Sequence, residues 1–82
     1  GDVYKRQVQV RSEEAFWRTV RAGFALRRKT LVNSLQTGWQ LPKEQLAAIV
    51  AGCGLSPTVR GEALGLEEYA RLSDALLAAA GE

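Results

Sequence analysis

The chain has no histidine, a single cysteine and no long apolar run. Without histidine it lacks the side chain most often used as a general base near neutral pH, and it lacks the ligand clusters that zinc sites need. Cys53 alone cannot form an internal disulfide, which fits a reducing compartment. The longest apolar runs, 46–52 and 75–81, are far shorter than the roughly 20 residues of a membrane span. These absences predict a cytoplasmic protein with no metal site and no membrane segment.

Motifs for catalysis are missing as well. The carboxylate pairs Glu13–Glu14 and Glu67–Glu68 stand where helices are expected to begin, and the helix dipole accounts for them there. Gly52-Cys53-Gly54 does not follow a strand, as a glycine-rich phosphate loop must. No cation lies close to Cys53 in the sequence to activate its thiol, so we expect a small core residue near a helix end. We expect no catalysis by this chain alone.

The composition is that of one small globular unit, with 82 residues of which 46% are hydrophobic and 24% charged. The first seven residues share no pattern with the rest. Residues 2–7 read Asp-Val-Tyr-Lys-Arg-Gln, which is one translation of a transposon mosaic-end adapter used in sequencing libraries. We therefore expect 1–7 to be non-native. Residues 8–82 are expected to form a C-terminal helical domain whose native upstream part is missing.

Apolar residues recur at helical spacing in the first half of the chain. Ser12 is a good N-cap for a helix over 13–25. The buried stripe of that helix is expected to contain Phe16, Val20, Gly23 and Phe24. A second helix is expected over 28–36, with Leu31 and Leu35 buried and Val32 on one of the remaining faces.

The second half predicts two more helices and a short turn. Pro42 suits the first turn of a third helix. The apolar side of this helix is expected to contain Leu46, Ile49, Val50 and Cys53. Ser56-Pro57 predicts a short helical turn through Val59. A last helix is expected over 66–79, after a weakened capping box in which Glu68 can accept a hydrogen bond but Gly65 has no side chain to offer.

The last helix is expected to present Leu66, Tyr69, Leu72, Leu76 and Ala80 to the core. No strand-like alternation of useful length occurs after the first seven residues. The predicted fold class is therefore all-α, a small helical domain of four principal helices plus a short helical turn.

Charge is divided unevenly along the chain. Residues 8–35 contain six arginines or lysines and two glutamates, a balance of +4. Residues 36–82 contain three cations and six carboxylates, a balance of −3. Clustered cations create an attractive field that a mixed surface would cancel, so this asymmetry indicates one basic face and an anionic partner.

The densest cationic cluster is Arg27-Arg28-Lys29, which the pattern places at the start of the second helix. Exposed cations usually form only a solvated face. Arginine, however, binds phosphate through two parallel hydrogen bonds and lysine binds it as a point charge. These three residues, with Arg18 and Arg21 on the preceding helix, are therefore candidate contacts to a nucleic-acid backbone.

Three other side chains have two possible roles each. Asn33 can donate a hydrogen bond to RNA or can cap a helix locally. Trp17 and Trp39 can stack on bases, but tryptophan contributes heavily to small cores, so both are expected to be buried or partly buried.

Two segments carry a resemblance to a known family. Residues 20–35, which include Val20-Arg21-Ala22-Gly23-Phe24 and Arg27-Arg28-Lys29-Thr30-Leu31-Val32-Asn33-Ser34-Leu35, resemble the C-terminal domain of KsgA/RsmA-type ribosomal RNA adenine N6-dimethyltransferases. Gly54-Leu55-Ser56-Pro57 followed by Arg60-Gly61-Glu62 is similar to a later motif of the same family, and 66–72 is similar to its closing helix. The resemblance covers about 13–78.

This chain departs from the family pattern at a few positions. Val32 stands where the family often has arginine, which removes one possible phosphate contact. Gly23 and Gly61 stand where it often has alanine, Leu26 where it often has glutamine and Gly65 where it often has serine.

The resemblance implies a parent enzyme that uses S-adenosylmethionine to methylate N6 of two adjacent adenines in small-subunit ribosomal RNA, late in assembly. The expected partner is this RNA within the pre-30S subunit, and the expected state is a cytoplasmic monomer. The methyl-donor pocket and the motif that holds the adenine would lie in an N-terminal Rossmann-like domain that is absent from this chain. The helical domain would help to engage the RNA, and it would bind no cofactor by itself.

The resemblance also draws attention to Arg60, which matches the arginine of the family's second motif. Contact with RNA and an ion pair with Glu62 or another carboxylate are equally weighted alternatives for this residue. Two other functions remain open for the chain. One is a free-standing helical DNA-binding module of the helix-turn-helix type. The other is a helical protein-interaction domain with a solvated cationic face.

Overall fold

The computed structural model describes residues 10–26 and 28–81, and every regular element within these ranges is a helix. The elements in chain order are α2 (Glu13–Ala25), α3 (Leu31–Leu35), α4 (Lys43–Gly52), the 3-10 helix η1 (Gly61–Ala63) and α5 (Leu66–Ala80). The predicted all-α fold class is confirmed. The expected foreign segment 1–7 and residue Arg27 lie outside the described ranges.

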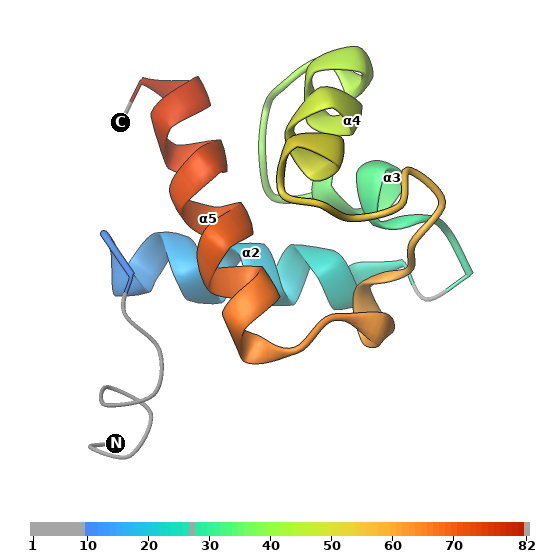
Figure 1. Ribbon diagram of the computed structural model, residues 1–82, viewed down its shortest axis with the longest axis horizontal. Helices are drawn as coiled ribbons and strands as arrows, with labels where there is room; N and C mark the ends of the chain where they lie inside the picture. The colour runs from blue at the N-terminus through green and yellow to red at the C-terminus, as the bar shows by residue number, and fades with distance from the viewer. Residues whose placement is uncertain (1–9, 27, 82) are drawn as a thin grey trace.

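Helix α2 is the element against which most of the others pack. It contacts α5, α3 and η1, whereas α4 contacts α3 and α5. Figure 1 shows α2 running across the molecule, with α5 crossing it and with α3 and α4 above it. No helix in the described part of the chain is long and apolar enough to cross a membrane.

Local caps fix where α2 and α5 begin. The hydroxyl of Ser12 accepts a hydrogen bond from the Ala15 N–H over 3.1 Å, as expected for an N-cap. At α5 the Glu68 carboxylate accepts from the Gly65 N–H over 3.0 Å. Gly65 returns no side-chain hydrogen bond, so the weakened capping box predicted from the sequence is confirmed. The predicted bounds of these two helices agree with the structure to within one residue.

The end of α2 is set by a residue from another helix. If α2 continued, the Leu26 N–H would donate to the Ala22 carbonyl. It donates instead to the hydroxyl of Ser34 over 3.1 Å, and that hydroxyl donates to the Ala22 carbonyl. One buried hydroxyl thus satisfies both partners of the interrupted helical bond, and it attaches α3 to the end of α2.

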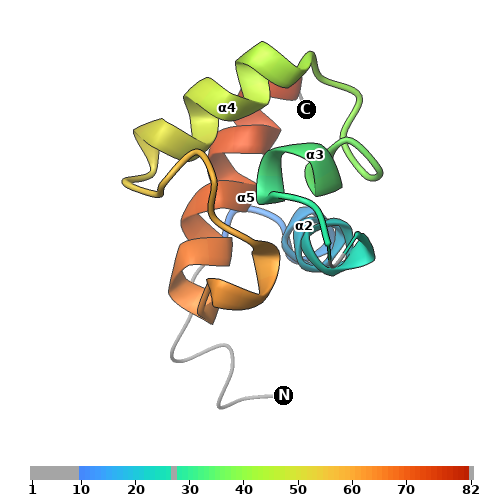
Figure 2. The ribbon, with the colours of Figure 1, turned by 90° about the vertical axis from the view of Figure 1, so that its right-hand side faces the viewer.

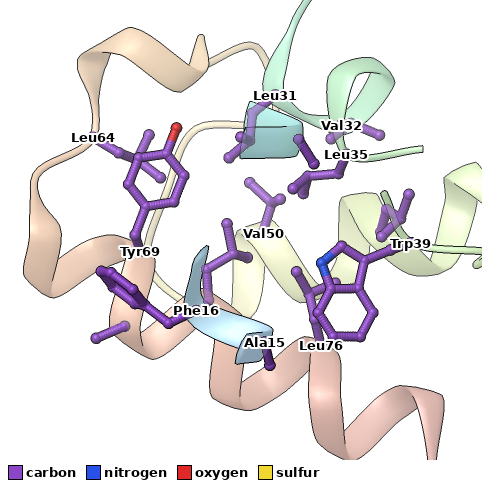
Figure 3. Close-up of a cluster of buried hydrophobic side chains, with 14 residues drawn as sticks. Ala15, Phe16, Leu31, Val32, Leu35, Trp39, Val50, Leu64, Tyr69 and Leu76 are labelled. Carbon is purple, nitrogen blue, oxygen red and sulfur yellow. The ribbon is translucent and has the colours of Figure 1, made fainter. Parts of the chain in front are cut away.

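The core lies where the four α-helices meet, and Figure 3 shows its side chains converging from all of them. Burying one large apolar side chain stabilises the fold by about 1.5–3 kcal/mol, so these residues supply most of the driving force. The largest fully buried apolar side chains are Trp39, Tyr69, Phe16, Leu31, Leu35, Leu46, Leu72, Leu76 and Val50.

Three expectations about which residues are buried were wrong. Phe24 and Leu66 were expected in the core, and each is 45% exposed. Val32 was expected on an outer face of its helix and is buried.

The buried face of α2 contains Ala15, Thr19 and Ala22 besides Phe16 and Gly23, because α3 and α5 both pack against this helix. Packing on two sides turned the buried stripe away from Phe24.

Two expected elements also shifted. The second helix begins at Leu31 instead of residue 28, so it is shorter than expected. Residues 56–59 form a turn closed by a 3.1 Å bond from the Val59 N–H to the Ser56 carbonyl, and the helical piece follows at η1. In the third helix Leu46 and Val50 are buried, whereas Ile49 and Cys53 are only partly buried.

Two glycines let α2 and η1 approach each other closely. A Cβ atom built on Gly61 would overlap the carbonyl oxygen of Gly23, and one built on Gly23 would overlap the hydroxyl of Tyr69. The Tyr69 hydroxyl, which is buried, donates to the Gly61 carbonyl over 2.7 Å. This contact holds η1 against the C-terminal end of α2.

Candidate nucleic-acid interface

The two segments that carry the family resemblance meet at one end of the molecule. The Leu31 N–H, at the start of α3, donates to the Val59 carbonyl over 2.7 Å. This bond brings the loop before α3 next to the segment that leads into η1. Figure 2 views the molecule from this end, with α2 seen nearly along its axis. Cations that are far apart in the sequence are therefore gathered in one region.

Arg28 and Lys29 lie in the loop between α2 and α3, and both are exposed. The expectation that these cations sit in the second helix was wrong. Ser34 ends α2 at Ala25, and a 3.0 Å bond from the Lys29 N–H to the Leu26 carbonyl forms a tight turn in its place. Arg27, the first residue of the cluster, lies outside the described residues. The two described cations are presented by a short turn that is fixed at both ends.

Arg60 is exposed and immediately precedes η1. Its carbonyl accepts a 3.0 Å bond from the Ala63 N–H, which fixes its backbone. Among the described residues no ion pair joins Arg60 to Glu62 or to another carboxylate. The structure therefore offers no intramolecular partner for this guanidinium within that part of the chain, and the predicted contact with RNA stays a prediction.

Arg21 and Asn33 complete the candidate residues near this end. Arg21 is exposed on α2, one turn before its end. Asn33 is half-buried on α3, and in the described ranges its side chain makes no hydrogen bond that would cap the helix. Both remain predicted contacts with RNA.

Arg18 differs from the other candidates because its side chain is engaged within the fold. Its Nε–H donates to the Gly38 carbonyl, and its guanidinium carbon lies 4.0 Å from the centroid of the Trp39 ring. A cation above an aromatic face contributes about 0.5–1 kcal/mol or more. Arg18 thus attaches α2 to the segment that follows α3, and the predicted phosphate contact would compete with this structural role.

The two tryptophans have different environments. Trp39 is 1% exposed, and its Nε1–H donates to the Thr19 hydroxyl over 3.1 Å, so it cannot stack on a base. Trp17 is 42% exposed, and its ring packs edge-on against Phe16 with the centroids 5.0 Å apart. The expected burial is confirmed for Trp39 and was wrong for Trp17, which is exposed.

A cleft of about 240 Å³ opens between the end of α2 and η1, close to the cationic loop. It is lined by Gly23, Phe24, Leu26, Gly61 and Glu62. The sequence pattern missed this cleft because it placed Phe24 in the core. The exposure of an aromatic residue immediately before a run of cations is the signal that would have found it.

Cys53 has the properties of a structural thiol. It follows the end of α4, is partly buried and forms no disulfide. Burial raises the pKa of its thiol above the usual 9.0, and the nearby charge of Arg71 offsets this only in part. The thiol is therefore a poor nucleophile at neutral pH. Within the described residues no three possible ligands cluster to hold a metal ion.

Comparison with known proteins relates the chain to one group of curated proteins, although no protein-family model matches it. It is 46% identical over 71 residues to the ribosomal RNA small subunit methyltransferase A of Lactococcus lactis, which covers 85% of this chain and 24% of that protein. It is 46% identical over 79 residues to the protein of that name from Geobacter metallireducens, covering 95% of this chain and 29% of the relative. A relative from Bacillus mycoides, also of that name, is 46% identical over 76 residues. The chain spans about a quarter of the length of the curated relatives it matches.

Proposed function

We propose that this chain, which belongs to the ribosomal RNA small subunit methyltransferase A family, docks its parent enzyme on small-subunit ribosomal RNA. The observation that carries the proposal is the gathering of Arg28, Lys29 and Arg60 at one end of the molecule by the bond between Leu31 and Val59. All three side chains are exposed. Two short loops thus present cations to the same region of solvent.

Such a surface fits the phosphate backbone of RNA. A guanidinium can bind two phosphate oxygens at once, and each neutralised phosphate releases counterions, which makes the affinity dependent on salt. Contacts of this type position a protein on its nucleic acid without reading the sequence. We propose Arg21 and Asn33 as further contacts at this end, and Arg18 as a weaker candidate because of its bonds to Gly38 and Trp39. Arg27, which lies outside the described residues, is proposed as a contact from the sequence alone.

For the parent enzyme we propose S-adenosylmethionine-dependent methylation of N6 on two adjacent adenines of this RNA, within the pre-30S subunit and in the cytoplasm. The described residues do not fit the cofactor. They contain no strand, and so no strand–loop–helix unit of the kind that binds such nucleoside groups. The chemistry would therefore belong to other segments of the enzyme, while this chain binds RNA as part of a monomeric protein.

A helix-turn-helix module fits the structure less well. A recognition helix needs a side-chain face that can enter the major groove. Helix α3 has only five residues, and four of them are buried, namely Leu31, Val32, Ser34 and Leu35. Arg28, Lys29 and Arg60, which carry the proposal, lie on loops and not on a helix that could enter a groove.

The proposal can be tested by measuring how the affinity of the chain for a small-subunit RNA fragment depends on salt. Replacing both Arg28 and Lys29 with glutamine is expected to reduce the slope of log K against log salt by about 1.4–1.8, because each lost phosphate contact contributes about 0.7–0.9. The matched control replaces Lys43 and Arg71 with glutamine. Both residues are also exposed, so this variant removes the same charge at another place on the surface.

The control variant is expected to retain most of the slope. Equal losses in the two variants would mean that only the net charge matters, and the proposed surface would be wrong. A protein-interaction domain would show no measurable affinity for the RNA in any of the three proteins.

A further inference from the structure

The cleft between α2 and η1 differs in chemistry from the residues that flank its lining segments in the chain. Its walls include the side chains of Phe24 and Leu26, which are 45% and 40% exposed. The Phe24 ring lies 6.0 Å from the Tyr69 ring, tilted by 39°, so Tyr69 supports it from the core side. Gly23 and Gly61 have no side chains, so they line the cleft with backbone atoms only. An aromatic ring beside an aliphatic side chain is the kind of surface on which a nucleobase stacks.

The lining of the cleft is negatively polarised. Glu62 contributes an exposed carboxylate, and an ionised carboxylate only accepts hydrogen bonds. The C-terminal turn of α2 forms another wall, and it carries the negative end of the helix dipole. A phosphate would be repelled from this interior, whereas a group with N–H donors would be attracted.

Residues of the opposite charge flank the lining segments in the chain. Arg28 and Lys29 follow Leu26 in the chain after one intervening residue, and Arg60 directly precedes Gly61. Both lining segments therefore pass straight into exposed cations. The volume of about 240 Å³ is below the ~300–1,000 Å³ of pockets that hold drug-sized ligands, which suits one planar base but not a whole nucleotide.

We propose that this cleft holds one unstacked guanine of single-stranded RNA, stacked against Phe24 and hydrogen-bonded to Glu62, while its flanking phosphates contact Arg28, Lys29 and Arg60. Guanine fits because its Watson–Crick edge offers two adjacent donors, N1–H and the N2 amino group, which a carboxylate can accept together. Specific recognition of RNA generally uses unstacked bases read along such edges. This inference rests on the proposed function, since it gives the phosphate-binding surface a base to select.

The test uses short uridine oligonucleotides with one central guanosine, one central inosine or no purine, and it measures their affinity for the full chain by fluorescence anisotropy. The guanosine oligonucleotide is expected to bind about tenfold more tightly than the all-uridine one, because a purine has a larger stacking face than uracil and guanine offers the carboxylate two adjacent donors. Inosine lacks the N2 amino group, and its oligonucleotide is expected to bind about threefold to tenfold less tightly than the guanosine one.

Two variants assign the effect to the cleft. Phe24→Leu keeps an apolar side chain without the aromatic face, and it is expected to lose most of the guanosine preference. Glu62→Gln is expected to abolish the difference between guanosine and inosine. The matched control, Glu44→Gln, changes an exposed glutamate on α4, a helix that forms no part of the cleft, and is expected to retain the difference.

The outcomes separate this inference from the proposed function. Binding with a normal salt slope but without any guanosine preference, or a preference that survives Phe24→Leu, would overturn the base site and leave the phosphate surface intact. A preference that survives Glu62→Gln would overturn the assigned hydrogen bonds. No binding to any oligonucleotide or to the ribosomal RNA fragment would overturn both proposals.

Discussion

The middle of α2 and the loop beyond its C-terminal end use similar residues in opposite ways. Near the middle of the helix, Arg18 bonds to the Gly38 carbonyl and covers the ring of the buried Trp39. Beyond its C-terminal end, Arg28 and Lys29 are exposed in a turn. Ser34 creates this difference, because its hydroxyl stops the helix at Ala25 and releases the cations into a loop.

The role of a cation in this chain therefore depends on what packs beneath it. Arg18 lies above an aromatic residue that the segment after α3 brings back to α2, and it becomes part of the structure. The cations after α2 lie beside a cleft and a glycine-lined contact with η1, where they remain available. A charge count of the sequence treats these residues alike.

The largest expected effect on stability is at Trp39, the buried ring that lies beneath Arg18 of α2. Trp39→Ala is expected to lower the free energy of unfolding by about 3–5 kcal/mol, because it removes a large buried ring, the hydrogen bond that this ring donates to the Thr19 hydroxyl and the aromatic face beneath Arg18. Trp17→Ala is expected to cost less than half as much, since this ring is 42% exposed. Urea unfolding followed by far-ultraviolet circular dichroism gives both values. Equal losses would erase the distinction between the two tryptophans, and Trp39→Phe replaces Trp39→Ala if the latter does not fold.

The contact between α2 and η1 is expected to weaken at high pH. Burial raises the pKa of the Tyr69 hydroxyl from 10.0 to about 12, so the folded protein keeps its proton where the unfolded chain loses it. The stabilisation is fully present below pH 10 and is lost progressively between pH 10 and 12. By pH 12 the free energy of unfolding is expected to be lower by about 2 kcal/mol. Chemical unfolding at pH 8 to 12 should show a steeper decline for the wild-type chain than for Tyr69→Phe. Parallel curves would contradict the assignment.

Ser34→Ala tests whether this hydroxyl ends α2. The variant leaves the Ala22 carbonyl and the Leu26 N–H without their partner, and it is expected to lose about 1–3 kcal/mol. Ser56→Ala, at an exposed turn, is the matched control and is expected to change stability by no more than about 0.5 kcal/mol. Amide hydrogen exchange at Leu26 should accelerate in Ser34→Ala. Unchanged exchange would mean that something else protects this amide.

The smallest effect on stability is expected for the exposed cation. Arg28→Gln is expected to change stability by less than about 0.5 kcal/mol and to reduce the salt slope of RNA binding by about 0.7–0.9. Arg18→Gln is expected to do the reverse, with a loss of about 1–2 kcal/mol and little change in slope. The two variants remove the same charge, so each is the control for the other. Urea unfolding and RNA titration of both proteins measure the two effects. A larger change in slope for Arg18→Gln would make Arg18 a main contact with RNA.

Much of the fold could be predicted because its signals are local. Ser12 and the glutamates that follow it mark the start of α2, and Glu68 with Gly65 marks the start of α5. The buried faces were predicted less well. Leu66 has the correct helical spacing and is still 45% exposed, because it lies in the first turn of α5, and Phe24 is exposed because α2 is covered on two other sides.

The candidate site divides in the same way. The basic residues and the two family segments were visible in the sequence, whereas the meeting of Arg28 and Lys29 with Arg60 was not. The Leu31–Val59 bond joins residues 28 positions apart, and no periodicity along the chain reports such a pairing. The cleft was missed for the same reason, because its two walls come from segments that are distant in the sequence.

The sequence by itself determined the helical class, the starts of the long helices and the family, since caps, spacing and matched residues are properties of neighbouring positions. The tertiary structure alone decided what holds the end of α2, which arginine is engaged and which aromatic ring remains exposed. Each of these depends on a residue that reaches α2 from elsewhere in the chain: Ser34 at its end, Trp39 beneath Arg18, and Gly61 and Tyr69 beside Phe24.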